Sequence, residues 1–279
     1  MPLSRRLFLN SLIVAPCLNA QNQTGTAVLM RLTDRKVLYV DNADFAARAL
    51  LPPASTIKPF AIFALLEAGK LRNDDLFSCQ RRLQIQGHVL NCVHPQTPVP
   101  MNAARALAYS CNGAVAHFAL RFAADELPQA LIRFGFTSQS GILRSAEATG
   151  VVQLGTVGPT CQLQALGEEG VAVTPLELLL AYSRLAERLK DAKYAAVREG
   201  LEGAVEFGTA QAAQVAGLKV AGKTGSIVLR SGSPAAWFAG FAPSRDPKTA
   251  VVVLTAGRSG GTDAAPIAAE LLKRYAGAV

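Results

Sequence analysis

Ser55 and Lys58 form the first pair of residues in this sequence that can do chemistry together. Side chains three residues apart on a helix share one face, so the Lys58 amine can reach the Ser55 hydroxyl. A lysine whose pKa is lowered by burial or by another cation can take that proton and activate the serine as a nucleophile. The pair therefore predicts covalent acyl transfer through Ser55. The non-catalytic interpretation is a serine cap beside a solvated lysine.

A second motif, Ser110-Cys111-Asn112, falls at a break between two predicted helices. Its hydroxyl and amide are suited to relaying a proton and holding a substrate amide. Taken alone, the same residues also fit an ordinary helix-end turn.

A third motif, Lys223-Thr224-Gly225-Ser226, falls on a predicted strand. Lys223 would add positive charge beside the nucleophile, and Gly225 would let a ligand backbone come close. The hydroxyls of Thr224 and Ser226 would bind a carboxylate. Taken alone, the motif also fits a polar strand edge.

The elements that must position these motifs follow from the apolar pattern. Residues 26–32 and 37–40 are two β-prone runs around a short polar turn, which predicts a hairpin. From Ser55 to residue 68 the apolar residues recur at helical spacing, with Pro59 in the first turn. Further helices are predicted at 102–108, 114–124, 126–134, 176–189 and 264–275, and further strands at 218–229, 235–242 and 249–256.

Strands at both chain ends and helices between them indicate an α+β fold, an α/β sandwich. We expect one antiparallel sheet of about five strands, built from both ends of the chain and flanked by helices. An all-α subdomain is expected as an insertion at about residues 71–200.

The first twenty residues are typical of an export signal. Arg5 and Arg6 precede an apolar stretch over 7–15, and small residues follow up to Ala20. Residues 4–9 are also similar to a twin-arginine motif. We therefore expect an export signal over 1–20, with the protein in the periplasm or cell envelope, by the twin-arginine or the general secretory route. Whether the signal is cleaved stays open.

The composition and charge of the chain limit the kinds of binding partner that we expect. The chain has 279 residues, half of them hydrophobic, and a formal net charge of +8. The positive residues are scattered rather than gathered with aromatics, so nucleic acid is not an expected partner. An anionic polymer such as cell wall suits the charge better.

Cysteine and histidine spacing predicts no metal site and no cofactor. Four cysteines follow the signal, without a C-x-x-C spacing, and no histidines are paired at i, i+4. Cys79 and Cys92 are expected either to close a short disulfide loop or to remain free and buried. The four cysteines after the signal are Cys79, Cys92, Cys111 and Cys161, and the three histidines are His88, His94 and His117.

In combination, the three motifs resemble those of the penicillin-binding transpeptidase domain, in the same chain order. Further stretches are similar to the same family, so the resemblance extends over about residues 25–275. They are 53–60, 109–112, 167–178, 236–243 and 260–266. We therefore expect a catalytic domain of this type over 21–279, with the β-lactamase/transpeptidase-like fold.

The resemblance implies a role for each motif residue. Ser55 attacks the carbonyl of a terminal D-Ala-D-Ala bond, and Lys58 is its base. Ser110 and Lys223 pass a proton to the leaving amine. Asn112, Thr224, Gly225 and Ser226 bind the substrate. The implied partners are peptidoglycan stem peptides and β-lactam antibiotics, with cell-wall synthesis proteins as further candidates.

Two other functions remain open beside transpeptidase, carboxypeptidase or endopeptidase activity. One is a serine β-lactamase on the same fold, and the other is a non-catalytic β-lactam sensor. Against the β-lactamase, the chain has no E-x-x-L-N run, and Asn112 stands where class D enzymes have valine. Ser226 stands where many transpeptidases have threonine.

Overall fold

The structure is a computed structural model that describes residues 25–96, 99–143, 146–229 and 231–278. The expected export signal at 1–20 lies outside the described residues. Within the described part of the chain, no helix is both long enough and apolar enough to span a bilayer.

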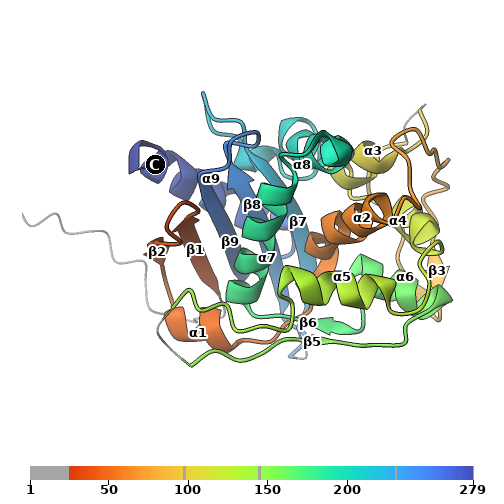
Figure 1. The fold of residues 1–279 in the computed structure, drawn as a ribbon, viewed down its shortest axis with the longest axis horizontal. Helices are drawn as coiled ribbons and strands as arrows, with labels where there is room; N and C mark the ends of the chain where they lie inside the picture. The colour runs from red at the N-terminus through yellow and green to blue at the C-terminus, as the bar shows by residue number, and fades with distance from the viewer. Residues whose placement is uncertain (1–24, 97–98, 144–145, 230, 279) are drawn as a thin grey trace, which may run out of the picture.

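One five-stranded antiparallel sheet organises the molecule (Figure 1). Its strand order is β2-β1-β9-β8-β7, so the N-terminal hairpin pairs with the last strand of the chain. The strands are β1 (Thr26–Arg31), β2 (Val37–Val40), β7 (Ala221–Val228), β8 (Pro234–Ala242) and β9 (Thr249–Ala256). The expected α+β fold with a sheet built from both chain ends is confirmed.

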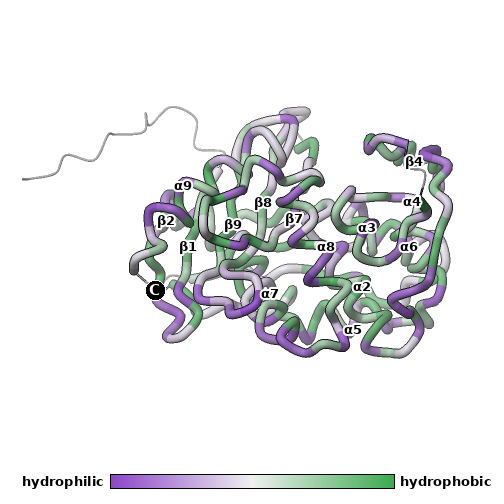
Figure 2. The backbone as a smooth tube through the Cα atoms, turned by 90° about the horizontal axis from the view of Figure 1, so that it is seen from above, coloured by the Kyte–Doolittle hydropathy of each residue, from purple (hydrophilic) through white to green (hydrophobic). Residues whose placement is uncertain are grey.

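Both faces of the sheet are buried. Successive residues of a strand point to opposite faces, and along β8 they alternate between two hydrophobic cores. Trp237 belongs to the core on the side of α7 (Pro175–Arg188), and Phe238 belongs to the core on the side of α9 (Ala265–Tyr275). β8 and β9 are therefore hydrophobic along most of their length, as Figure 2 shows.

A helical region lies beside the sheet, next to β7. The first helix after the hairpin, α1 (Ala43–Arg48), instead contacts β1 and α7. The helical region comprises α2 (Lys58–Glu67), α3 (Ala103–Ala108), α4 (Asn112–Ala119), α5 (Glu126–Phe134), α6 (Gly158–Leu166) and α8 (Ala195–Glu206). Short strand pairs and single helical turns complete the described elements: β3 (Gln84–Ile85), β4 (His88–Val89), β5 (Val151–Val152), β6 (Val171–Ala172), η1 (Ala54–Ile57), η2 (Ala192–Tyr194), η3 (Gln211–Ala213), η4 (Gly260–Ala264) and η5 (Ala276–Ala278).

The predicted elements differ from the structure in a few places. The helix expected at 114–124 begins at Asn112, because the Cys111 side chain caps it, and ends at Ala119, where the chain tightens into three-residue turns. The sequence does not predict α1, α6 or α8. In α8, Gly200 and Gly203 lower helix propensity but leave room for α3, since a Cβ on Gly200 would lie 2.8 Å from the Ala104 carbonyl oxygen.

Candidate active site

Ser55 lies in a strained turn at the start of α2. The preceding Ala54 has φ 48°, a left-handed conformation that a non-glycine residue rarely adopts. Residues 54–57 then form the single turn η1, and α2 follows directly. Ser55 is partly exposed, whereas Thr56 and Lys58 are fully buried. The turn therefore presents the Ser55 hydroxyl at the surface while its neighbours are fixed in the core.

Hydrogen bonds from two other elements hold this turn. The Trp237 indole on β8 donates to the Pro52 carbonyl at 3.1 Å, and the Tyr182 hydroxyl on α7 donates to the Thr56 carbonyl at 2.8 Å. The Thr56 hydroxyl itself donates to the Pro53 carbonyl at 2.6 Å. These bonds satisfy carbonyl groups on both sides of Ser55, which offsets the cost of the strained backbone.

Two glycines let other segments approach the turn. On β7, a Cβ at Gly225 would lie 3.2 Å from the Pro53 carbonyl oxygen and 3.3 Å from the Ala54 Cβ. At Gly167, where φ is +76°, a Cβ would lie 2.2 Å from the Ala54 carbonyl oxygen. The sequence predicted that Gly225 lets a ligand come close. In the structure, its missing side chain lets β7 pack on residues 53–56, the turn that carries Ser55.

Lys58 is buried with no carboxylate among its hydrogen-bond partners in the described residues. Its amine donates to the Ser110 carbonyl at 3.0 Å, to the Ser110 hydroxyl at 3.2 Å and to the Asn112 side-chain oxygen. Burial disfavours the charged form and lowers the pKa of Lys58 to about 8. A useful fraction of Lys58 is therefore neutral near physiological pH and can accept a proton.

The second motif lies between α3 and α4. Ser110 has φ 55°, and this turn directs both its carbonyl and its hydroxyl to Lys58. Asn112 is the first residue of α4, and its amide nitrogen donates to the Leu90 carbonyl at 3.0 Å. Lys58 is thus bonded to the second motif rather than to Ser55, and no Lys58–Ser55 hydrogen bond is present in the described residues. Such contacts commonly form only when substrate binds.

Lys223 places a second amine in the same interior. It is fully buried on β7 and donates to the Thr224 carbonyl at 3.0 Å. Burial, and then the nearby charge of Lys58, hold the pKa of Lys223 well below its ordinary value. The two buried amines therefore oppose each other's protonation.

A cleft of about 610 Å³ opens beside Pro52 and Ala54, just before Ser55 in the chain. Ala54 and Ser226 line it, together with Glu168 and Arg258. Burial raises the pKa of the Glu168 carboxyl, and the positive Lys58 opposes this shift. The Thr224 hydroxyl is instead buried against Thr209, 2.8 Å from its hydroxyl oxygen, so Ser226 is the hydroxyl of the third motif that lines the cleft.

The structure thus brings the second motif to Lys58 and the third motif to the turn that carries Ser55, with Thr224 turned away from the cleft. No site role was assigned to Arg258 or Glu168 from the sequence. Pairing of β8 with β9 brings Arg258 back to the start of β8, where Pro234 also lines the cleft. A correct strand register would have been the signal for Arg258.

Comparison with known families agrees with this arrangement. The model of the penicillin-binding protein transpeptidase domain matches residues 21–273. The chain belongs to this family. The resemblance drawn from the three motifs is confirmed.

Two curated relatives of this transpeptidase domain are bacterial proteins. Stage V sporulation protein D of Bacillus subtilis is 26% identical, over 84% of this chain and 43% of its own length. Peptidoglycan D,D-transpeptidase PbpA of Mycolicibacterium smegmatis is 28% identical, over 77% of this chain and 53% of its own length. The chain therefore spans about half the length of the curated relatives it matches.

Solved structures share the fold at lower identity. PBP2 of Pseudomonas aeruginosa, in complex with WCK 5153, aligns with a TM-score of 0.79 at 21% identity, covering 90% of this chain and 70% of its own. Penicillin binding protein 3 of Mycobacterium tuberculosis aligns with a TM-score of 0.75 at 19% identity, covering 90% and 73%.

The buried Lys58 amine gives the first testable prediction. If Lys58 is the base, the acylation rate of Ser55 by a fluorescent penicillin should rise with pH through an apparent pKa of about 8, because only the neutral amine accepts a proton. Below that pH the rate should fall about tenfold per pH unit. Stopped-flow measurement across this range tests it. Lys58→Arg, which stays charged, should react about 10²–10⁴-fold more slowly. A rate independent of pH would exclude Lys58 as the base.

Gly167 gives a second prediction, because its close approach to Ala54 can be separated from its positive φ. Gly167→Ala should lose about 3 kcal/mol or more of unfolding free energy and should slow the reaction of Ser55. Gly217, with φ +74° and no atom within 4 Å of the added Cβ, is the matched control. Gly217→Ala should lose about 1–2 kcal/mol and react normally. Urea denaturation and the penicillin reaction measure both, and equal behaviour of the two variants would contradict the packing role of Gly167.

Proposed function

We propose that this chain is a serine D,D-acyltransferase of peptidoglycan, acting on D-Ala-D-Ala ends of stem peptides through a Ser55 acyl-enzyme. The observation that supports this most directly is the position of Lys58. Its buried amine, with a lowered pKa, contacts Ser110 and Asn112, while the partly exposed Ser55 lies one helical turn away, directly after Ala54, which lines a cleft. The arrangement combines a nucleophile, a base and a proton relay.

In the proposed reaction, neutral Lys58 takes the proton of the Ser55 hydroxyl as its oxygen bonds to the carbonyl carbon of the substrate. Backbone N–H groups of Ser55 and Ser226 stabilise the oxyanion that forms. The proton then passes from Lys58 through the Ser110 hydroxyl, 3.2 Å away, to the leaving amine. The C–N bond breaks, D-Ala leaves, and the peptide remains as an ester on Ser55. Lys223, whose pKa is held well below its ordinary value by burial, is a second amine that can accept this proton and pass it on.

The open edge of β7 supports binding of an extended peptide. β7 is the last strand of the five-stranded sheet, and no described strand pairs with its outer side. A stem peptide can add there as a further strand, the usual mode of β-augmentation. The Ser226 hydroxyl and the Arg258 guanidinium, which both line the cleft, are suited to the terminal carboxylate of the substrate. In this proposal the Asn112 side chain also binds a substrate amide, in exchange for one of its present bonds to Lys58 and Leu90.

The acyl acceptor in this proposal is the amine of a second stem peptide. The names of the two curated relatives, one a D,D-transpeptidase and one a sporulation protein, favour a role in cell-wall assembly. Such a role requires export, consistent with the signal expected at residues 1–20, and would bring the chain into contact with other cell-wall synthesis proteins.

Time-resolved intact mass with benzylpenicillin tests the proposed function. We expect a stable adduct on the wild-type protein and none on Ser55→Ala, because the Ser55 oxygen forms the ester bond. D-Ala release from a stem-peptide mimic should likewise require Ser55. An adduct that disappears quickly with drug turnover would identify a β-lactamase instead. A wild-type protein that forms no adduct would refute the nucleophilic role of Ser55.

Arg258 gives a prediction about carboxylate binding. Arg258→Ala should lower kcat/KM for a D-Ala-D-Ala peptide about tenfold to hundredfold, because a charge-assisted hydrogen bond is lost. Arg245 is the matched control, since it lies in the turn between β8 and β9 at the other end of these strands and is exposed. Arg245→Ala should leave kcat/KM unchanged. Equal kinetics of the two variants with the peptide would remove Arg258 from the carboxylate site.

A further inference from the structure

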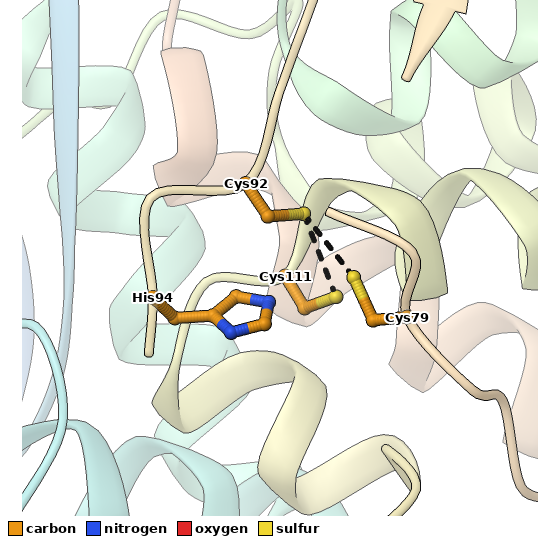
Figure 3. Close-up of side chains that lie close together, drawn as sticks. All are labelled: Cys79, Cys92, His94 and Cys111. Carbon is orange, nitrogen blue, oxygen red and sulfur yellow. Dashed lines mark hydrogen bonds between the residues drawn. The ribbon is translucent and has the colours of Figure 1, made fainter. Parts of the chain in front are cut away.

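Three cysteines and one histidine converge behind the second motif (Figure 3). Cys79, Cys92 and His94 come from the irregular segment between α2 and α3, and Cys111 caps α4. One side-chain ligand atom from each residue lies within 4.8 Å of the others. Cys92, His94 and Cys111 are buried, and Cys79 is partly buried.

The sulfur spacing suits a tetrahedral metal ion. The Cys92 Sγ lies 3.6 Å from the Cys79 Sγ and 3.7 Å from the Cys111 Sγ. Zn–S bonds of about 2.3 Å at tetrahedral angles place sulfur atoms about 3.8 Å apart. A disulfide instead needs about 2.05 Å. Free thiols in contact lie at similar distances, so the sulfur spacing fits both a metal ion and three free thiols. The observation that favours the metal ion comes from His94.

His94 has a buried nitrogen with no hydrogen-bond partner in the described part of the chain. Its Nδ1 lies 2.8 Å from the Pro95 carbonyl oxygen, an acceptor, so Nδ1 carries the proton and Nε2 carries a lone pair. The His94 side chain is 5% exposed, and its Nε2 finds no hydrogen-bond partner among the described residues. In Figure 3 a ring nitrogen points toward the three sulfur atoms. A buried acceptor without a partner costs about 1–3 kcal/mol and requires an explanation.

We propose that Cys79, Cys92, His94 and Cys111 bind one Zn²⁺ ion in a closed tetrahedral site. Three thiolates and one imidazole are a common ligand set for structural zinc. The Nδ1–H bond to the Pro95 carbonyl is the usual outer contact of a zinc-bound histidine, and it fixes the ring with Nε2 toward the metal. Four protein ligands leave no open position, so this ion would stabilise the structure rather than take part in the chemistry.

A zinc ion at this site would restrain the break between α3 and α4, which carries Ser110 and Cys111. Cys111 lies between Ser110 and Asn112, the two residues that hold the Lys58 amine. The Gly113 N–H already points to the Cys92 sulfur at 3.4 Å, and Asn112 bonds to Leu90 in the same segment. Zinc would join the segment over 79–94 to the start of α4 and so fix the positions of Ser110 and Asn112. Metal binding does not depend on the proposed function, whereas this effect on acylation does.

Metal content of the full chain, purified without a histidine tag from zinc-supplemented cells, tests the site. We expect about one zinc per chain by mass spectrometry of the metal, and at least about a tenfold lower content in Cys79→Ser and His94→Ala. Cys161→Ser is the matched control, because Cys161 is a buried free cysteine on α6 outside the cluster. It should retain the zinc. Wild-type protein without zinc, or equal loss in Cys161→Ser, would overturn the proposal.

Cobalt substitution tests the ligand set in the wild type, so the result does not depend on whether the variants fold. Added Co²⁺ should give thiolate-to-metal charge-transfer absorption and the strong visible bands of a tetrahedral site, and Zn²⁺ should abolish both. Weak octahedral bands would contradict the assignment. So would a wild-type mass lower by two hydrogen atoms with a Cys79–Cys92 disulfide in the peptide map.

Thermal unfolding separates a clamp from adventitious binding. A strong zinc chelator should lower the Tm of the wild type and of Cys161→Ser by about 5 °C or more, and zinc should restore it. The Tm of His94→Ala should not respond to either. In parallel, the chelator should slow the reaction of Ser55 with penicillin about tenfold. If the chelator left the wild-type Tm unchanged, the structural role of the zinc ion would be overturned. Slower acylation in the presence of the chelator would not rescue that role.

Discussion

The site depends on the burial of two lysine amines, neither of which bonds to a carboxylate among the residues that the structure describes. Lys58 is bonded to the neutral groups of Ser110 and Asn112, and Lys223 to a backbone carbonyl. Removing two like charges from water is costly, and the cost falls when one or both amines lose a proton. Burial thus accounts for the lowered pKa of Lys58, about 8, which its proposed role as a base requires.

Maintaining that arrangement requires contributions from distant parts of the chain. α2 carries Lys58, the α3–α4 break brings Ser110, and the edge strand β7 brings Lys223. Trp237 on β8 and Tyr182 on α7 donate hydrogen bonds to backbone carbonyls on the two sides of Ser55. The Trp237 bond joins the sheet to the Ser55 turn and the Tyr182 bond joins α7 to it, so the geometry of the site depends on the packing of sheet and helices together.

The three motifs and the sheet could be predicted because their signals are local. Alternating and helical apolar patterns locate strands and helices, and S-x-x-K, S-x-N and K-T-G gain specificity from their order and from the elements that carry them. Other features depend on tertiary contacts. The positive φ of Ala54 and the proximity of Gly167 to it have no periodic signature. Likewise the sulfur cluster joins positions 79, 92 and 111 through a segment with little regular structure, which is why cysteine spacing suggested no metal ligand set.

The outer side of β7, with which no described strand pairs, has a consequence for the order in which two peptide substrates bind. A strand edge offers its backbone hydrogen bonds to one neighbour at a time, so two extended peptides cannot occupy β7 together. If the donor peptide pairs there, the acceptor must arrive by another route, either from the helical side or after the leaving D-Ala has vacated the cleft. Kinetically, such a geometry favours a substituted-enzyme scheme, in which the first product departs before the second substrate binds.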